Sequence, residues 1–170
     1  METGYHGTSV QAARRILLEG FEPSRNEYDW LGDGAYFFQG APARALDWAR
    51  ERFGADAAVV GAEIDLGGCI DLLDTRWNAV VREAYDGLLA ILAREGLPVP
   101  RQGAGAHRLD RAVINHAAGL LEETGMQVRS VRASFREGDP LYPGSALYDR
   151  AHVQVCVRDL SAIIRAWRER

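Results

Sequence analysis

The chain has 170 residues, of which 47% are hydrophobic and 26% charged, and its formal net charge at pH 7 is −4. This length and composition predict one globular domain over residues 1–170, and the acidic balance disfavours broad electrostatic binding of nucleic acid. The polar start METGYHGTS shows no signal-peptide pattern. No stretch reaches the ~18 apolar residues of a membrane span. We therefore expect a cytoplasmic protein that does not contact membranes.

The first half of the chain alternates short extended segments with helices. Residues 2–6 are expected to be extended, and Ser9 suits the cap of a helix over 10–19 that Gly20 ends. Polar and turn-forming residues predict a loop over 22–33. The other elements expected here are a strand over 34–38, a helix that begins at Pro42, and strands over 57–66 and 69–73.

The second half is expected to begin with two helices, over 80–94 and about 109–123, joined by a flexible connection over 97–105. A half-exposed strand over 126–135 follows, with Val128, Val131 and Ala133 on one face. Next come a loop over 137–150 and a strand over 152–158. The pattern leaves the type of 160–170 open. The fold class predicted from this order is α+β.

The two cysteines, Cys69 and Cys156, lie in apolar strand-like runs, which is typical of buried thiols in a reducing compartment. Clusters of ligand residues at zinc-binding spacing are absent from the sequence, so no metal is expected.

Two short motifs carry the functional signal. They are Tyr5-His6-Gly7-Thr8-Ser9 and Gly34-Ala35-Tyr36-Phe37, each at the expected end of a strand. A helix–loop crossover between them would make His6 and Tyr36 neighbours. Gly7 leaves its backbone N–H and C=O uncovered for a flat amide, and Tyr36 with a second aromatic residue could sandwich an aromatic ring. Taken alone, His6 is typical of an ordinary strand-end histidine and Tyr36 of a core residue, and only the joint pattern favours a functional role.

In order and spacing, these motifs resemble the ADP-ribosyltransferase superfamily, in its H-Y-E branch of PARP-like and diphtheria-toxin-like proteins. There a strand ends in His-Gly-Thr/Ser, and a helix and a Gly-Φ-Tyr-Phe strand follow. The resemblance covers residues 4–73 and, more loosely, 126–165. It implies two packed, mainly antiparallel sheets that form an NAD cleft, with helices inserted around residues 80–123.

The resemblance also implies an activity: NAD as co-substrate, and transfer of its ADP-ribose to a macromolecular acceptor with release of nicotinamide. His6 would hydrogen-bond the nicotinamide-side ribose, and the Gly7 backbone would hold the carboxamide. Tyr36 would stack on the nicotinamide, with Trp48 as the opposing wall. The further candidate contacts of NAD, towards its adenosine and phosphates, are Thr8, Ser9, Arg25, Asn26 and Tyr28.

The chain departs from the family at the third motif residue, which is usually a Glu on the strand after a variable loop. The expected strand over 152–158 has no Glu. Gln154 is the first candidate for the position, because its amide can bond a ribose hydroxyl. His152 is the second, and Glu137, at the start of the preceding loop, could supply a carboxylate. Loss of this Glu in the superfamily goes with mono-ADP-ribosylation or with inactivity.

The loop over 137–150 is expected to select the acceptor, a protein or a nucleic acid, through Tyr142 and Tyr148. Four arginines flank it and are either phosphate contacts or a solvated face: Arg129, Arg132, Arg136 and Arg150. Asp110 and His116 are interpreted as surface or structural residues. The resemblance further suggests a bacterial, toxin-like setting and an inhibitor or antitoxin partner. Alternative functions are an NAD glycohydrolase, a non-catalytic NAD-binding module and, less favoured, an RNA 2′-phosphotransferase.

Overall fold

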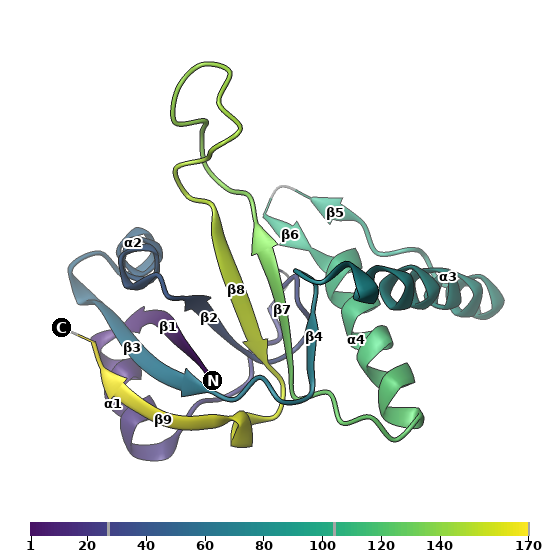
Figure 1. The fold of residues 1–170 in the computed structure, drawn as a ribbon, viewed down its shortest axis with the longest axis horizontal. Helices are drawn as coiled ribbons and strands as arrows, with labels where there is room; N and C mark the ends of the chain where they lie inside the picture. Colours follow the sequence, from purple (N-terminus) through teal and green to yellow (C-terminus); the bar gives the residue numbers. More distant parts are fainter. Residues whose placement is uncertain (27, 104, 170) are drawn as a thin grey trace.

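A single seven-stranded sheet forms the centre of the computed structural model, which describes residues 1–26, 28–103 and 105–169 (Figure 1). In spatial order the strands are β4 (Cys69–Asp71), β7 (Ser130–Phe135), β8 (His152–Val157), β2 (Ala35–Gln39), β1 (Glu2–Ser9), β3 (Ala57–Ile64) and β9 (Ile163–Arg168). Neighbouring strands are antiparallel except β4 and β7, which run parallel. The α+β class is thus confirmed.

The expectation of two separate packed sheets is wrong, because β1 pairs with β2 on one side and with β3 on the other. The connection between the two halves is narrow. Among the described residues, β1 and β2 pair at only two positions, Gly4 with Gln39 and Tyr5 with Phe38. Pairing with β3, in contrast, runs along the whole of β1. The sheet therefore consists of a β9-β3-β1 half and a β2-β8-β7-β4 half that separate beyond Tyr5.

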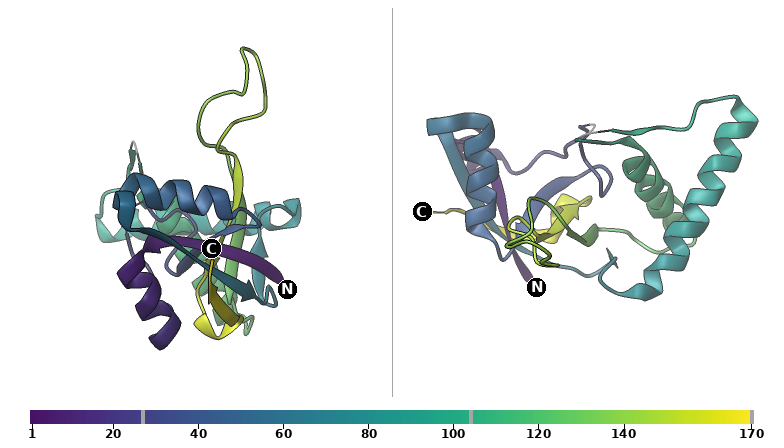
Figure 2. Two further views of the ribbon diagram at one scale, coloured as in Figure 1. Left: turned by 90° about the vertical axis from the view of Figure 1, so that its left-hand side faces the viewer. Right: turned by 90° about the horizontal axis from the view of Figure 1, so that it is seen from above.

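Helices cover both ends of the sheet (Figure 2). They are α1 (Val10–Glu19), α2 (Pro42–Phe53), α3 (Asn78–Glu95) and α4 (Arg108–Glu123). α1 begins and ends as expected: the Ser9 hydroxyl accepts from the Ala12 N–H at 3.2 Å, and Gly20 takes a φ of 93°. Pro42 stands in the first turn of α2. α1 and α2 lie at one end of the molecule, and α3 packs on α4 at the other.

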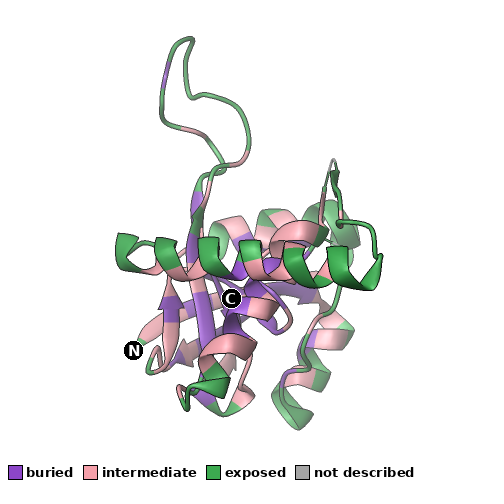
Figure 3. Cartoon of the chain, turned by 90° about the vertical axis from the view of Figure 1, so that its right-hand side faces the viewer, coloured by how far each residue is buried: buried purple, intermediate pink, exposed green. Residues whose placement is uncertain are grey.

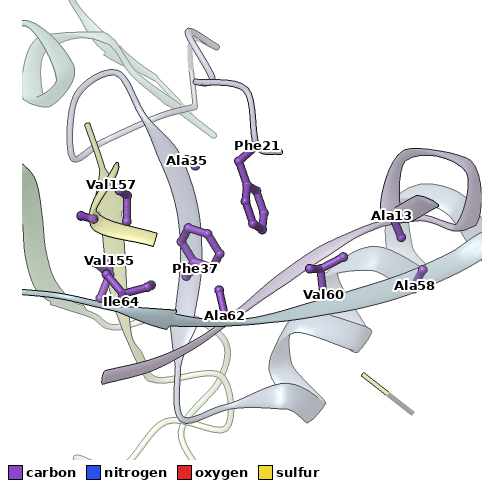
Figure 4. Packing of buried hydrophobic residues seen from close by; sticks show 11 residues of the cluster. Ala13, Phe21, Ala35, Phe37, Ala58, Val60, Ala62, Ile64, Val155 and Val157 are labelled. Carbon is purple, nitrogen blue, oxygen red and sulfur yellow. The ribbon is translucent and has the colours of Figure 1, made fainter. Parts of the chain in front are cut away.

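The largest buried cluster lies between α1 and the sheet (Figure 4). At its centre the rings of Phe21 and Phe37 meet edge to face, with centroids 4.9 Å apart. Ala13 from α1 and Val60 from β3 belong to the same cluster, and all four side chains are buried. Buried positions follow the strands, whereas the outer faces of the helices are exposed (Figure 3).

Three expected boundaries change. The connection over 97–105 is partly ordered, because β5 (Gln102–Gly103) pairs with β6 (Ala106–His107); Ala104 lies outside the described residues. The strand expected from residue 126 begins at Ser130, and its mixture of buried, intermediate and exposed residues confirms the half-exposed character. The undecided end contains a short 3₁₀ turn, η3 (Leu160–Ala162), followed by β9.

The remaining short elements are the 3₁₀ turns η1 (Gly54–Asp56) and η2 (Thr75–Trp77). Within the described ranges, no helix has both the length and the apolar character needed to cross a bilayer.

Candidate functional site

The side chain of His6 hydrogen-bonds β2 just beyond the last main-chain pair between β1 and β2. Its Nδ1 lies 2.9 Å from the main-chain oxygen of Tyr36. A carbonyl oxygen only accepts, so Nδ1 carries the proton and Nε2 is left as an acceptor. Burial lowers the pKa of His6 from its ordinary value, and the bond to Tyr36 opposes that effect. The result is a neutral imidazole with a fixed tautomer.

The rings of His6 and Tyr36 do not share a face of β2. The imidazole contacts Phe21 and Phe37, with centroids 5.5 and 5.9 Å away. Phe37 follows Tyr36 on the strand and therefore points to the opposite side. The two candidate residues are neighbours, as the motif spacing suggested, but through a side chain and a backbone carbonyl rather than as two walls of one cleft.

The backbone N–H and C=O of Gly7 are directed towards β2. Val59, which lies opposite Gly7 on β3, accepts on its β9 side from the Glu169 N–H at 3.1 Å. Gly7 and Val59 are therefore a non-hydrogen-bonded antiparallel pair, in which the two residues direct their backbone N–H and C=O groups away from one another. The β1–β2 ladder has already ended at Tyr5, and within the described residues no main-chain partner is present for Gly7 on this side. A donor and an acceptor thus lie side by side, which matches the edge of a carboxamide.

Gly7 also permits α2 to approach the sheet closely. A Cβ at this position would lie 2.3 Å from the carbonyl oxygen of Ala45 and 3.2 Å from the Trp48 ring. Any side chain larger than hydrogen would displace the helix. The glycine of the motif therefore has a packing role here, and it brings Trp48 next to the Gly7 backbone, which is buried.

Tyr36, Trp48 and Gln154 face the same side of the sheet. Phe38 packs with Trp48 beneath α2. Tyr36 stands two residues before Phe38 on β2, and Gln154 is the partner of Phe38 on β8; both therefore share its face. This side is also the one towards which a Gly7 side chain would point. The structure thus brings the two expected stacking residues and the third-position candidate to one surface.

The Tyr36 hydroxyl is fixed by the preceding loop. It accepts from the Leu31 N–H at 2.9 Å and donates to the Gly32 carbonyl at 2.7 Å. Burial raises the pKa of Tyr36 far above its ordinary value. The phenol therefore keeps its proton and positions the loop rather than acting as a base, which leaves its ring as the part available for stacking.

Helix α4 holds the same loop from the other side, and sequence reasoning missed these contacts. Arg111 donates to the Asp33 carboxylate at 2.7 Å, which lowers the pKa of Asp33 against the opposing effect of burial. The Asn115 side-chain oxygen accepts from the Asp33 N–H at 3.0 Å and from Arg158 at 2.7 Å. Gly32, with a φ of +84°, has no space for a Cβ beside Asn115. Packing on α4 therefore explains Gly32 and Asp33, whereas Gly34 lies against β8, where a Cβ would be 2.5 Å from the Val157 carbonyl oxygen.

An arginine occupies the space between two predicted contacts of NAD. The guanidinium of Arg52 lies over the Tyr28 ring at 4.6 Å and over the Trp48 ring at 5.1 Å. It also donates to the Tyr28 hydroxyl at 3.2 Å. Tyr28 thus lies against α2, and Arg52 is a residue of this surface that no motif or periodicity indicated.

Gln154 already has a partner. Its side-chain oxygen accepts from the Trp30 indole N–H at 2.5 Å, which leaves the amide NH₂ to donate. His152, the second candidate, is buried between Phe38 and Phe135 at 4.8 and 5.5 Å. Its Nδ1 bonds the Arg150 carbonyl at 2.7 Å, whereas Nε2 is buried without a partner among the described residues.

Glu137 forms an ion pair with Arg44 of α2 at 2.6 Å, and the Arg44 side chain is only 10% exposed. Arg44 also lies over the Phe38 ring, at 5.1 Å. The carboxylate therefore connects the loop after β7 to α2. In this position the Glu137 carboxylate neutralises the nearly buried Arg44 guanidinium. A carboxylate held in this ion pair is less able to act as a catalytic base.

The other predicted NAD contacts are less well placed. The Ser9 hydroxyl is used as the cap of α1, and Thr8 is buried. Arg25 and Asn26 are exposed, and the Asn26 amide donates to Ser24 at 2.7 Å.

The arginines expected near the acceptor loop have partners within the chain. Arg129 pairs with Asp65 and Asp159, Arg132 with Asp71, and Arg150 with Glu51. Arg136 lies over the Tyr148 ring at 4.8 Å. Of these four arginines, only Arg136 stacks on an aromatic side chain of the loop over 137–150.

The thiols are poor nucleophiles. Cys156 is buried and Cys69 half-buried, both are unpaired, and burial raises the pKa of each. Within the described ranges, no group of three or more His, Cys, Asp or Glu residues could hold a metal ion.

Two surface cavities lie beside the helices, one at α2 and one at α4. One, of about 630 Å³, is bounded by the start of α2 and by Asp149 and Arg150. The other, of about 400 Å³, lies between α3, α4 and the Trp30-Leu31 segment. Neither is lined by His6, Gly7 or Tyr36. No protein-family model matches the sequence, and no curated protein is significantly similar to it.

Proposed function

We propose that the chain is an NAD-dependent mono-ADP-ribosyltransferase. The observation that carries the proposal is the backbone of Gly7: its donor and acceptor lie beyond the last β1–β2 pair, beside Trp48 and on the side that Tyr36 faces. A nicotinamide needs such a pair for its carboxamide and aromatic walls for its ring. The proposal rests on the resemblance of the motifs together with this geometry.

In the proposed reaction the bond between the nicotinamide nitrogen and C1′ of the ribose breaks, and neutral nicotinamide leaves. The acceptor nucleophile bonds to C1′ and releases its proton to solvent. Positive charge that develops on the ribose is stabilised by polar groups already in place. The Nε2 acceptor of His6 would bind a ribose hydroxyl, because Nδ1–H is held by Tyr36.

Gln154 would orient the ribose rather than remove a proton. An amide has no basic site at neutral pH, and its oxygen is held by Trp30. Its NH₂ group would donate to a ribose oxygen. This chemistry favours a single transfer over chain building, which needs a group that activates the next hydroxyl.

The long loop after β7 is proposed to contact the acceptor or an inhibitor protein. It projects beyond the rest of the molecule (Figure 1). Its tip exposes three apolar side chains, Leu141, Tyr142 and Leu147, each 57–61% exposed. Such exposure on a projecting segment is typical of contact with another macromolecule.

A non-catalytic NAD-binding module is the second candidate, favoured by the ion pair that occupies Glu137. Nicotinamide release from NAD separates these functions, measured in buffer and in cell extract. Release in extract alone supports the transferase, and release in buffer indicates a glycohydrolase. Protection by NAD against thermal unfolding, without release, indicates the module. If NAD is neither cleaved nor able to protect the chain against unfolding, the family assignment is overturned.

The variants His6→Ala, Trp48→Leu and Gln154→Ala test the site itself. We expect each to reduce release by about 100-fold, the usual effect of removing one preorganised group. His116→Ala and Gln127→Ala are matched controls outside this face and should retain release. Equal activity of Gln154→Ala and Gln127→Ala would remove Gln154 from the mechanism.

A further inference from the structure

The cavity between α3, α4 and the Trp30-Leu31 segment has the properties of a ligand site separate from the NAD surface. Its volume of about 400 Å³ lies in the range of small-molecule sites, which is about 300–1,000 Å³. Its apolar lining comes from four segments distant in the sequence: the Trp30-Leu31 segment, Leu72, α3 and, through Leu109 and its neighbours, α4. Leu31, Val113 and Ile114 are buried, so the deep part of the cavity is apolar.

Two charged residues, Asp110 and Arg82, complete the lining, and their surroundings differ. Asp110 already has partners within the chain, because its carboxylate accepts from the Gln102 side-chain amide and lies 3.5 Å from a His107 nitrogen. Arg82 is exposed, and no ion pair or hydrogen bond of its side chain is present within residues 1–26, 28–103 and 105–169. The rim therefore offers a positive charge.

We propose that this cavity binds a small aromatic acid, with its ring system against the apolar lining and its anionic group on Arg82. A carboxylate or sulfonate matches the guanidinium in charge and in hydrogen-bond geometry. Trp30 forms part of the wall and donates its indole N–H to Gln154. A ligand in the cavity would thus contact the side chain that holds Gln154. The proposal does not depend on NAD chemistry.

The test uses a matched pair of fluorescent probes on the full chain. 8-Anilinonaphthalene-1-sulfonate carries an aromatic system and an anion, and N-phenyl-1-naphthylamine is its uncharged analogue. We expect saturable 1:1 binding of the sulfonate and at least about tenfold weaker binding of the neutral probe, since one charge-assisted contact changes affinity by about this factor.

Four variants locate the site. Arg82→Gln should weaken sulfonate binding by about tenfold and leave the neutral probe unchanged. Arg94→Gln, on the same helix and paired with Glu95, should change neither. Leu109→Trp fills the cavity and should abolish saturable binding, whereas Leu97→Trp, at an exposed position outside it, should not.

Absence of saturable binding to the unmodified chain would overturn the proposal. So would equal sulfonate affinity of Arg82→Gln and Arg94→Gln, a comparison at exposed positions that does not depend on how Leu109→Trp folds. Neither result would bear on nicotinamide release, so the two proposals fail independently.

Discussion

The imidazole Nδ1 of His6 and the main-chain oxygen of Tyr36 are 2.9 Å apart, and this bond stands where a main-chain pair would otherwise continue the sheet. A side chain thus replaces a rung of the ladder and holds the β1 and β2 halves together at the point where they separate. His6→Ala should lower the free energy of unfolding by about 1–3 kcal/mol, because it removes a partly buried hydrogen bond. Urea denaturation measures this, with His116→Ala as control; equal losses for both variants would contradict it.

His6 and His152 predict how stability depends on pH. Burial lowers the pKa of both His6 and His152 from the ordinary value of 6.5. Between the lowered value and 6.5 the unfolded chain binds protons that the native chain does not. The free energy of unfolding should therefore be fully retained above about pH 6.5 and fall as the pH decreases through this window.

His152→Phe isolates the contribution of one ring to this pH dependence. Phenylalanine preserves the contacts with Phe38 and Phe135 and removes the unpartnered Nε2. We expect a shallower decrease of stability between pH 7 and pH 5 than in the unmodified chain. Chemical denaturation at several pH values is the measurement, and an unchanged slope would mean that His152 does not contribute.

A methyl group at Gly7 tests the close approach of α2. The added Cβ would lie 2.3 Å from the Ala45 carbonyl oxygen, so Gly7→Ala should destabilise the chain by about 3 kcal/mol, as overpacking does. Gly119→Ala is the control: it lies within α4, and nothing lies within 4 Å of the added Cβ. That change should stabilise the chain by about 0.5–1 kcal/mol. Similar values for both would contradict the account.

The role of Glu137 can be separated by measuring activity and stability together. Glu137→Gln leaves the nearly buried Arg44 without its counter-charge, so we expect a loss of about 3 kcal/mol. Glu22→Gln interrupts an exposed pair with Arg15 and should change stability by less than about 1 kcal/mol. If Glu137→Gln keeps its stability but loses nicotinamide release, the carboxylate is catalytic instead.

Asn115 connects α4 to the loop that holds the Tyr36 hydroxyl. Its side-chain oxygen accepts from both Asp33 and Arg158, so Asn115→Ala should cost about 2–3 kcal/mol by leaving these donors unpaired. Gln127→Ala, which removes an exposed bond to Asp159, should cost less than about 0.5 kcal/mol. Thermal unfolding of both variants checks the difference.

Local signals explain which parts of the fold could be predicted from the sequence. Ser9 and Gly20 mark the ends of α1 because a cap depends on residues within one turn. The alternation on β8 correctly placed Gln154 and Cys156 on one face. What failed was the choice of strand partners: nothing near β1 or β2 indicates that two pairs at Gly4 and Tyr5 join the halves into one sheet.

The residues of the candidate site, like the elements of the fold, could be predicted only where a local sequence signal exists. His6 and Tyr36 were correctly expected to be neighbours because one helix–loop crossover connects them. The bonds from Trp30 to Gln154 and from Arg44 to Glu137 join residues far apart in the chain. Periodicity cannot reveal such pairs, and Arg52 had no local feature to distinguish it from the other surface arginines. The sequence motifs therefore predicted the candidate site, whereas the long-range contacts that support it could not be predicted from the sequence.

The position of β3 has a consequence for how the chain folds. This strand lies between the first strand of the sheet and the last, pairing with β1 on one edge and with β9 on the other, where Trp167 packs over Gly61. Its second edge can be covered only after nearly the whole chain has been brought back to it. Pairing at such sequence separation is slow. A late, rate-limiting docking of β9, with an uncovered β3 edge open to self-association until then, is the kinetic cost of this topology.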